Sequence, residues 1–104
     1  MKNNGKNNIL VFKSVIKSLA SDAAIEIDGV TVADAKRYKK SGIEVEFLEN
    51  DKVSVSLPIV IELGYTVPKT VAAVQERVKG EIENATRFKV ASVNVEVVSV
   101  SVPQ

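Results

Sequence analysis

The sequence predicts a two-layer α+β domain in which two helices pack on one face of a three-stranded mixed sheet. Two observations carry this prediction. From Val53 to Leu63, apolar residues fall on every second position, which is typical of a strand with one buried face. After Pro68 the apolar residues recur every three or four positions, which is the period of a helix buried along one stripe. That stripe consists of Val71, Val74, Val78, Ile82 and Ala85.

The composition describes a chain that can bury one core and carries few reactive groups. Its 104 residues are 45% hydrophobic, which suits one domain. The absence of cysteine and histidine excludes disulfides, thiolate metal sites and histidine catalysis. No apolar run approaches the ~20 residues that span a bilayer, and residues 1–8 lack the apolar core of a signal peptide. We therefore expect a cytoplasmic protein. The net charge of +1 argues against a dedicated nucleic-acid binder.

The N-terminal part predicts a tail followed by a helix. Residues 1–8 are polar and are expected to be disordered, which leaves residues 9–104 as a single domain. Apolar residues at helical spacing predict a helix over Ile9–Ile27, with Asn8 as a candidate cap. In an alternative interpretation, residues 9–11 form a short extra N-terminal strand and the helix begins near Lys13.

A hairpin is expected in the middle of the chain. Residues 30–42 have the least regular pattern, with one short turn of helix expected between Val32 and Tyr38. Ile43–Leu48 alternates as a strand, and turn residues at 49–52 join it to the strand from Val53. Pro58 has no N–H to donate, so its nitrogen must face an edge or a bulge.

The C-terminal part predicts a helix over Pro68–Thr86 and a last strand over Lys89–Val102. The valines of that strand change from odd to even positions after Val97, which favours a bulge near Val97–Val98. The alternative is a strand that is apolar on both faces at this step. The predicted order of elements is α-β-β-α-β.

Two groups of residues give the chain a resemblance to a known family. The first runs from Val15-Ile16 to Gly29-Val30; the second comprises the 53–64 strand, Val67-Pro68, Val74-Gln75 and Val93-Asn94-Val95. Together they resemble the alkaline shock protein family of bacteria over nearly the whole chain. The resemblance implies a small non-catalytic domain tied to alkaline and cell-envelope stress, held near the membrane in some members by a membrane-anchored partner. Phe12 and Arg87 depart from the pattern, standing where the family usually has Ser and often has Gly.

Gln75 and Asn94 are candidate interaction residues, because they are the polar members of the most specific motifs. They could contact a partner protein. The interpretation that we favour is structural: each amide bonds the backbone at a helix–strand junction, since buried amides must be paired.

Two groups of charged residues are candidate ligand sites. Lys36, Arg37, Lys39 and Lys40 surround one tyrosine and could contact an anion or nucleic acid, although a solvated loop is the favoured interpretation. The acidic residues of the 43–52 hairpin lack the spacing of a dedicated cation loop. We expect no catalytic residue, cofactor or metal site.

The leading functional hypothesis is a non-catalytic protein-interaction module that binds protein partners or its own copies. Val98, Val100 and Val102 are the candidate contacts, because two helices can cover only one face of the sheet and few charges protect this edge. The alternative is a small RNA-binding α+β domain, which has a similar order of elements. Against it, the chain lacks both a Gly-x-x-Gly loop and an aromatic pair on a strand.

Overall fold

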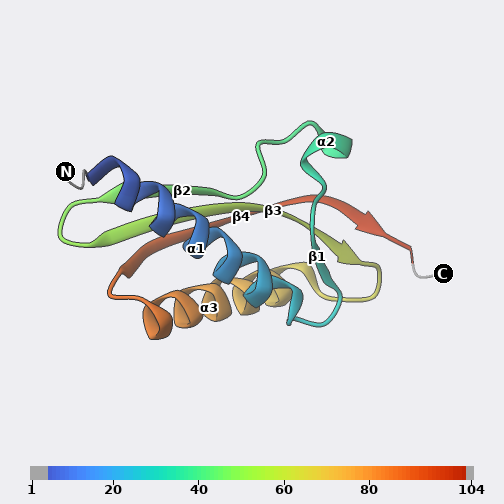
Figure 1. Cartoon of the computed structure of the whole chain (residues 1–104). Helices are drawn as coiled ribbons and strands as arrows, with labels where there is room; N and C mark the ends of the chain where they lie inside the picture. The colour runs from blue at the N-terminus through green and yellow to red at the C-terminus, as the bar shows by residue number, and fades with distance from the viewer. Residues whose placement is uncertain (1–4, 103–104) are drawn as a thin grey trace.

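The computed structural model describes residues 5–102 and has the predicted α+β architecture. Figure 1 shows α1 and α3 on one side of the sheet and the short α2 on the other. The elements in chain order are α1 (Gly5–Ile25), β1 (Val30–Val32), α2 (Ala35–Tyr38), β2 (Glu44–Leu48), β3 (Lys52–Glu62), α3 (Val67–Ala85) and β4 (Lys89–Ser101).

β3 is the central strand of a mixed sheet. One edge pairs in parallel with β4, and α3 provides the crossover that a parallel pair requires. The other edge pairs antiparallel with β2 along Lys52–Ser56 and with β1 along Ile59–Ile61. Because β1 and β2 follow one another along this edge, the sheet has four strands but is only three strands wide at any point.

Pro58 lies where β1 has ended and β2 has not begun. Its carbonyl accepts a hydrogen bond from the Ala33 N–H at 2.9 Å, so the proline nitrogen faces the same gap between the two strands. The missing N–H therefore costs no ladder bond, as predicted for an edge position.

The N-terminal prediction is corrected at two points. The helix begins at Gly5, so residues 5–8 of the expected tail are helical and Asn8 lies inside α1 rather than at its cap. Residues 9–11 are also helical, and the extra strand is instead β1. β1 has three residues, too few to show an alternating pattern, and its pairing partner lies about thirty residues further along the chain.

The core lies between the sheet and the two long helices. Ile16 and Ala20 of α1 and Val74 and Val78 of α3 are fully buried against the odd-numbered residues of β3. At the margins the sequence pattern overestimates burial. Leu63, the last residue of the predicted stripe, is 59% exposed because it lies beyond the end of β3. Val15 and Ala85 are exposed as well.

The bulge predicted at Val97–Val98 is present. Ile59 pairs with Val97 and Val60 with Ser99, which leaves Val98 as the extra residue. A second, unpredicted register shift lies near Ala91. The bulge at Val97–Val98 returns Val100 to the face of the sheet that bears Ile61, its partner on β3.

Two tight turns depend on left-handed backbone. The β2–β3 turn joins the paired residues Leu48 and Lys52 through three residues and places Asn50 and Asp51 at φ values of 63° and 57°, which suits the turn residues predicted at 49–52. After α1, Gly29 has a φ of 81°, and a Cβ there would lie 2.5 Å from the Tyr65 ring. Gly29 therefore permits both the tight turn that the Val30 N–H closes on the Ile27 carbonyl at 3.1 Å and the approach of Tyr65.

Truncating core residues from the two layers should destabilise the fold. Val74 and Ile61 are both fully buried. We expect Val74→Ala to lower the free energy of unfolding by about 1–3 kcal/mol and Ile61→Ala by about 2–5 kcal/mol, because each leaves a cavity. Urea denaturation measures both, and a neutral result for either change would contradict its assignment to the core.

The same Gly→Ala change should have opposite effects at two positions. Gly29→Ala should cost about 1–2 kcal/mol from the left-handed backbone alone, with the contact to Tyr65 added. Gly80 lies inside α3 with no atom near its potential Cβ, so Gly80→Ala should stabilise by about 0.5–1 kcal/mol. Thermal unfolding of both variants tests the pair; a stable Gly29→Ala protein would argue against the turn geometry.

Candidate functional site

The outer edge of β4 is protected by α3 over its first half. Gln75 Nε2 donates to the Val93 carbonyl at 3.0 Å, and the Val90 N–H donates to the Glu83 carboxylate at 2.9 Å. Two helix side chains thus occupy backbone groups that an incoming strand would need. Gln75 makes the backbone contact that the structural interpretation expects.

The second half of β4 has no such cover in the described part of the chain. Successive residues of a strand direct their backbone groups to opposite edges. The Val93 carbonyl faces α3 and the Ser101 carbonyl faces β3, where it accepts from the Leu63 N–H at 2.7 Å. Counting from these two points, Val95, Val97 and Val100 present their N–H and C=O groups outward.

Exposed apolar side chains accompany this open edge. Val100 is 47% exposed and Val102 is 70% exposed, close to the exposed Leu63. The bulge returns Val100 to the helix side of the sheet, but no element covers it fully. Val98, the bulged residue, is half-buried. The end of β4 therefore combines free backbone groups with apolar side chains.

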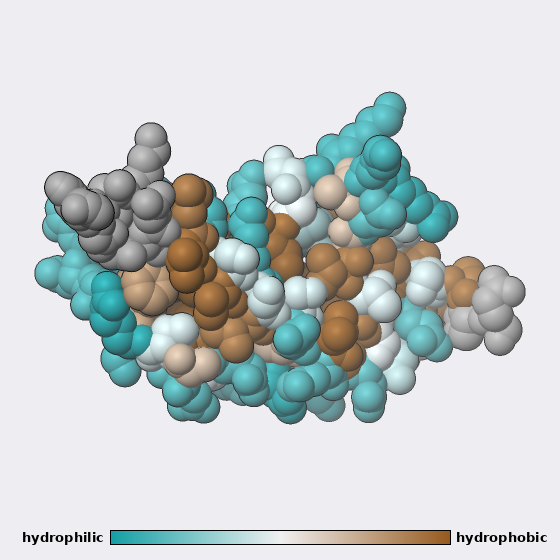
Figure 2. Space-filling model, viewed as in Figure 1, coloured by the Kyte–Doolittle hydropathy of each residue, from teal (hydrophilic) through white to brown (hydrophobic). Residues whose placement is uncertain are grey.

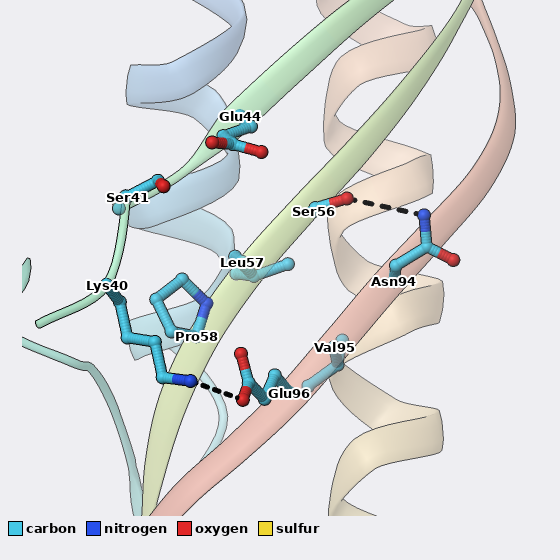
Figure 3. Close-up of a pocket in the computed structure, with 10 residues that line it drawn as sticks. Lys40, Ser41, Glu44, Ser56, Leu57, Pro58, Asn94, Val95 and Glu96 are labelled. Carbon is cyan, nitrogen blue, oxygen red and sulfur yellow. Dashed lines mark hydrogen bonds and ion pairs between the residues drawn. The ribbon is translucent and has the colours of Figure 1, made fainter. Parts of the chain in front are cut away.

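A shallow groove of about 300 Å³ lies on the opposite, open face of the sheet, beneath the segment that follows α2. Figure 3 shows Lys40 and Glu96 closing one end of this groove, with Ser56 and Asn94 facing each other across adjacent strands. Lys40 Nζ lies 2.8 Å from the Glu96 carboxylate. Both side chains are substantially exposed, so this pair contributes about 0–1 kcal/mol.

Polar groups of the groove bond one another. Asn94 Nδ2 donates to the Ser56 hydroxyl at 3.3 Å and to Ser54 at 3.5 Å, and the Ser54 and Ser92 hydroxyls are 2.6 Å apart. Asn94 thus bonds serine side chains of the adjacent strand β3, and not the backbone at a helix–strand junction as expected. These contacts describe a cross-strand polar ladder and reveal no nucleophile–base pair.

The basic run of residues 36–40 does not form one surface. Arg37 stacks on the Tyr38 ring at 5.4 Å, and Lys40 is held by Glu96. Lys36 is exposed on α2, and Lys39 adopts a left-handed conformation at the end of that helix. This arrangement adds nothing in favour of the RNA-binding alternative.

Sequence reasoning missed an aromatic cluster at the other end of the molecule. Phe88 packs edge-on against Phe12 and Phe47, with ring centroids 5.3 and 5.4 Å apart. The Arg87 guanidinium lies 5.0 Å from the Phe12 ring and 4.9 Å from the Phe88 ring. The signal was present as the two departures from the family pattern, Phe12 and Arg87, which contact each other in space.

Glu83 was also missed, because nothing in its spacing marks it as an acceptor for a strand N–H. Residues 5–102 contain no group of three or more acidic side chains placed to share a metal ion. In the same range, no helix is both long and apolar enough for a bilayer crossing.

Comparisons with known proteins give the chain a family and a fold relative. The chain is 28% identical over 97 residues to YqhY of Bacillus subtilis strain 168, an uncharacterised protein, covering 83% of this chain and 71% of the relative. Solved structures of the MamM C-terminal domain share the fold. A copper form aligns with a TM-score of 0.59 at 18% identity, over 88% of this chain and 98% of that domain. A variant of the same domain aligns at a TM-score of 0.52.

A family model for the alkaline shock protein 23 family, described by its cell envelope-related function, matches residues 1–102. This match spans both motif groups on which the sequence resemblance rested. The chain belongs to this family.

Proposed function

We propose that the chain is a non-catalytic protein-interaction module that serves cell-envelope and alkaline-stress homeostasis, and that it binds its partner by strand addition at the open half of β4. The single observation that carries this proposal is the division of the β4 edge. Gln75 and Glu83 occupy backbone groups of the first half, whereas the outward groups of the second half have no intrachain partner in the described structure.

The properties of this half-edge suit an added strand. Natural proteins usually protect exposed edges with charges or prolines. From Val90 to Val102 the only charged residue is Glu96, and Lys40 partly neutralises it. Main-chain hydrogen bonds would supply affinity, and contacts to Val100 and Val102 would supply selectivity. The partner is an extended protein segment, either from a membrane-anchored protein that keeps the chain close to the membrane or from a second copy.

The non-catalytic part of the proposal rests on the available chemistry. The chain has no histidine or cysteine. Its open-face groove presents serine hydroxyls and Asn94 that are bonded to one another. A positioned base within reach of a nucleophile, which general acid–base and covalent catalysis need, is not found among these groups.

Placing a charge at the open edge should weaken association. Val100→Lys puts a cation beside the groups that would receive the added strand, so we expect a lower mass by light scattering at high concentration, or weaker partner capture, by about tenfold or more. Ala72→Lys, the same charge on the exposed surface of α3, is the matched control and should change neither readout. A wild-type chain that is monomeric and a Val100→Lys variant with undiminished partner binding would together refute the proposal.

Removing the Glu83 carboxylate, which accepts the Val90 N–H, should expose the first half of the β4 edge. Glu83→Ala deletes the acceptor of the Val90 N–H, and we expect hydrogen exchange at that amide to accelerate about tenfold. Glu76→Ala, an exposed glutamate on the same helix, should leave the Val90 amide protected. If Glu83→Ala leaves exchange unchanged, something other than Glu83 guards this edge.

A further inference from the structure

The outer face of α1 has an unusual composition over its N-terminal half. Leu10, Val11 and Val15 are 58%, 60% and 43% exposed, and Ser14 and Ser18 lie between them. A surface helix normally directs charged residues to solvent. Figure 2, which looks onto α1, shows apolar side chains gathered over this half of the helix.

The exposed apolar surface continues from α1 onto the β2–β3 hairpin. Ile9 is 48% exposed and Leu48 is 39% exposed, and both line a cleft of about 480 Å³ above the Phe12–Phe47–Phe88 cluster. We call the five side chains of Ile9, Leu10, Val11, Val15 and Leu48 the α1 patch. Contiguous exposed apolar groups of this kind mark an interaction surface.

The charges around the α1 patch are predominantly basic on the helix itself. The first 21 residues contain four lysines and no acidic residue. Lys13 and Lys17 lie on the side of α1 that faces β2, and neither joins an ion pair among the described residues. Arg87 adds a third cation at the cleft, 3.6 Å from Asp51. Glu49 and Asp51 of the turn and Glu44 and Glu46 of β2 are the nearby acids.

We propose that the α1 patch binds the surface of an anionic lipid bilayer, with α1 lying in the plane of the interface. An apolar helix face bordered by lysines is the pattern of interfacial helices, whose apolar side chains enter the headgroup region while the cations contact anionic lipids. The only acidic residue of α1, Asp22, lies in its last turn, so the half that carries the patch has lysines and no acid. A protein partner would not require this arrangement, whereas an anionic surface favours it. The proposal goes beyond the proposed function and does not rest on it, because it uses a different surface.

Co-sedimentation with lipid vesicles tests this inference. We expect the full chain to bind vesicles of mixed phosphatidylglycerol and phosphatidylcholine, to bind poorly to pure phosphatidylcholine, and to lose binding as NaCl is raised. Lys13→Gln and Lys17→Gln should each weaken partition about fivefold, the fold-change equivalent to about 1 kcal/mol per basic residue near the surface.

A charge placed in the patch should be more damaging than the same charge elsewhere. Val11→Asp should reduce partition into anionic vesicles by about tenfold or more. Ala72→Asp, on the exposed side of α3, should reduce the same partition by about twofold or less. Circular dichroism verifies that both variants fold, which the 60% exposure of Val11 favours.

Three results of the vesicle experiment would overturn the inference: no binding to anionic vesicles, equal binding by wild type and Val11→Asp, or binding that salt does not weaken. A fall in mass for Val11→Asp without vesicles would assign the patch to a second copy instead and would also overturn it. Val100→Lys should bind vesicles as wild type does, so failure of strand addition at β4 and failure of lipid binding at α1 are separable.

Discussion

Pairing of β3 on both edges is the constraint on which the rest of the structure depends. Its even-numbered residues face the open side, and its odd-numbered residues form the floor of the core under α1 and α3. β1, β2 and β4 each bond to β3 and to no other strand. A continuous partner strand on the antiparallel edge would have a carbonyl opposite Pro58 with no N–H to accept from. The chain avoids this because two short strands, β1 and β2, pair on either side of Pro58. The connection between them, which contains α2, leaves this edge, and its Lys40 side chain reaches Glu96 at the open face.

The β–α–β connection on the other edge explains why β4 is unevenly protected. α3 must return the chain to the start of β3 so that β4 can run parallel to it. The helix therefore lies beside β4. Glu83, near the C-terminal end of α3, bonds the Val90 N–H, and Gln75, earlier in the helix, bonds the Val93 carbonyl further along the strand. Beyond Asn94 the structure describes no helix side chain bonded to the outer edge, and the strand continues to Ser101 without cover. The first half of the edge is bonded to α3, and the second half is the one at which we propose that a partner strand adds.

The two exposed apolar surfaces lie far apart. In Figure 1 the start of α1 and the end of β4 are at opposite ends of the molecule. Their chemistry differs as well: the α1 patch offers side chains bordered by cations, whereas the end of β4 offers backbone groups with few charges. A module with both surfaces would bind a protein segment at one end and an anionic lipid surface at the other. Such a pair of contacts agrees with the cell envelope-related function of its family.

Local patterns alone determined much of this fold. The alternation of β3, the stripe of α3, the Asn-Asp hairpin turn and the Val97–Val98 bulge were readable because each signal lies within a few neighbouring residues. β1 was not readable, since three residues show no period and only the distant Ile59–Ile61 segment gives them a role. The start of α1 was misplaced because the polar residues 5–8 have no apolar stripe of their own. Gln75, Glu83, Asn94 and Arg87 acquired their roles only from partners brought close by packing, between 7 and 75 positions away in sequence. Tertiary structure also decided which valines of β4 are covered, because burial depends on where the helices end and not on the strand's own pattern.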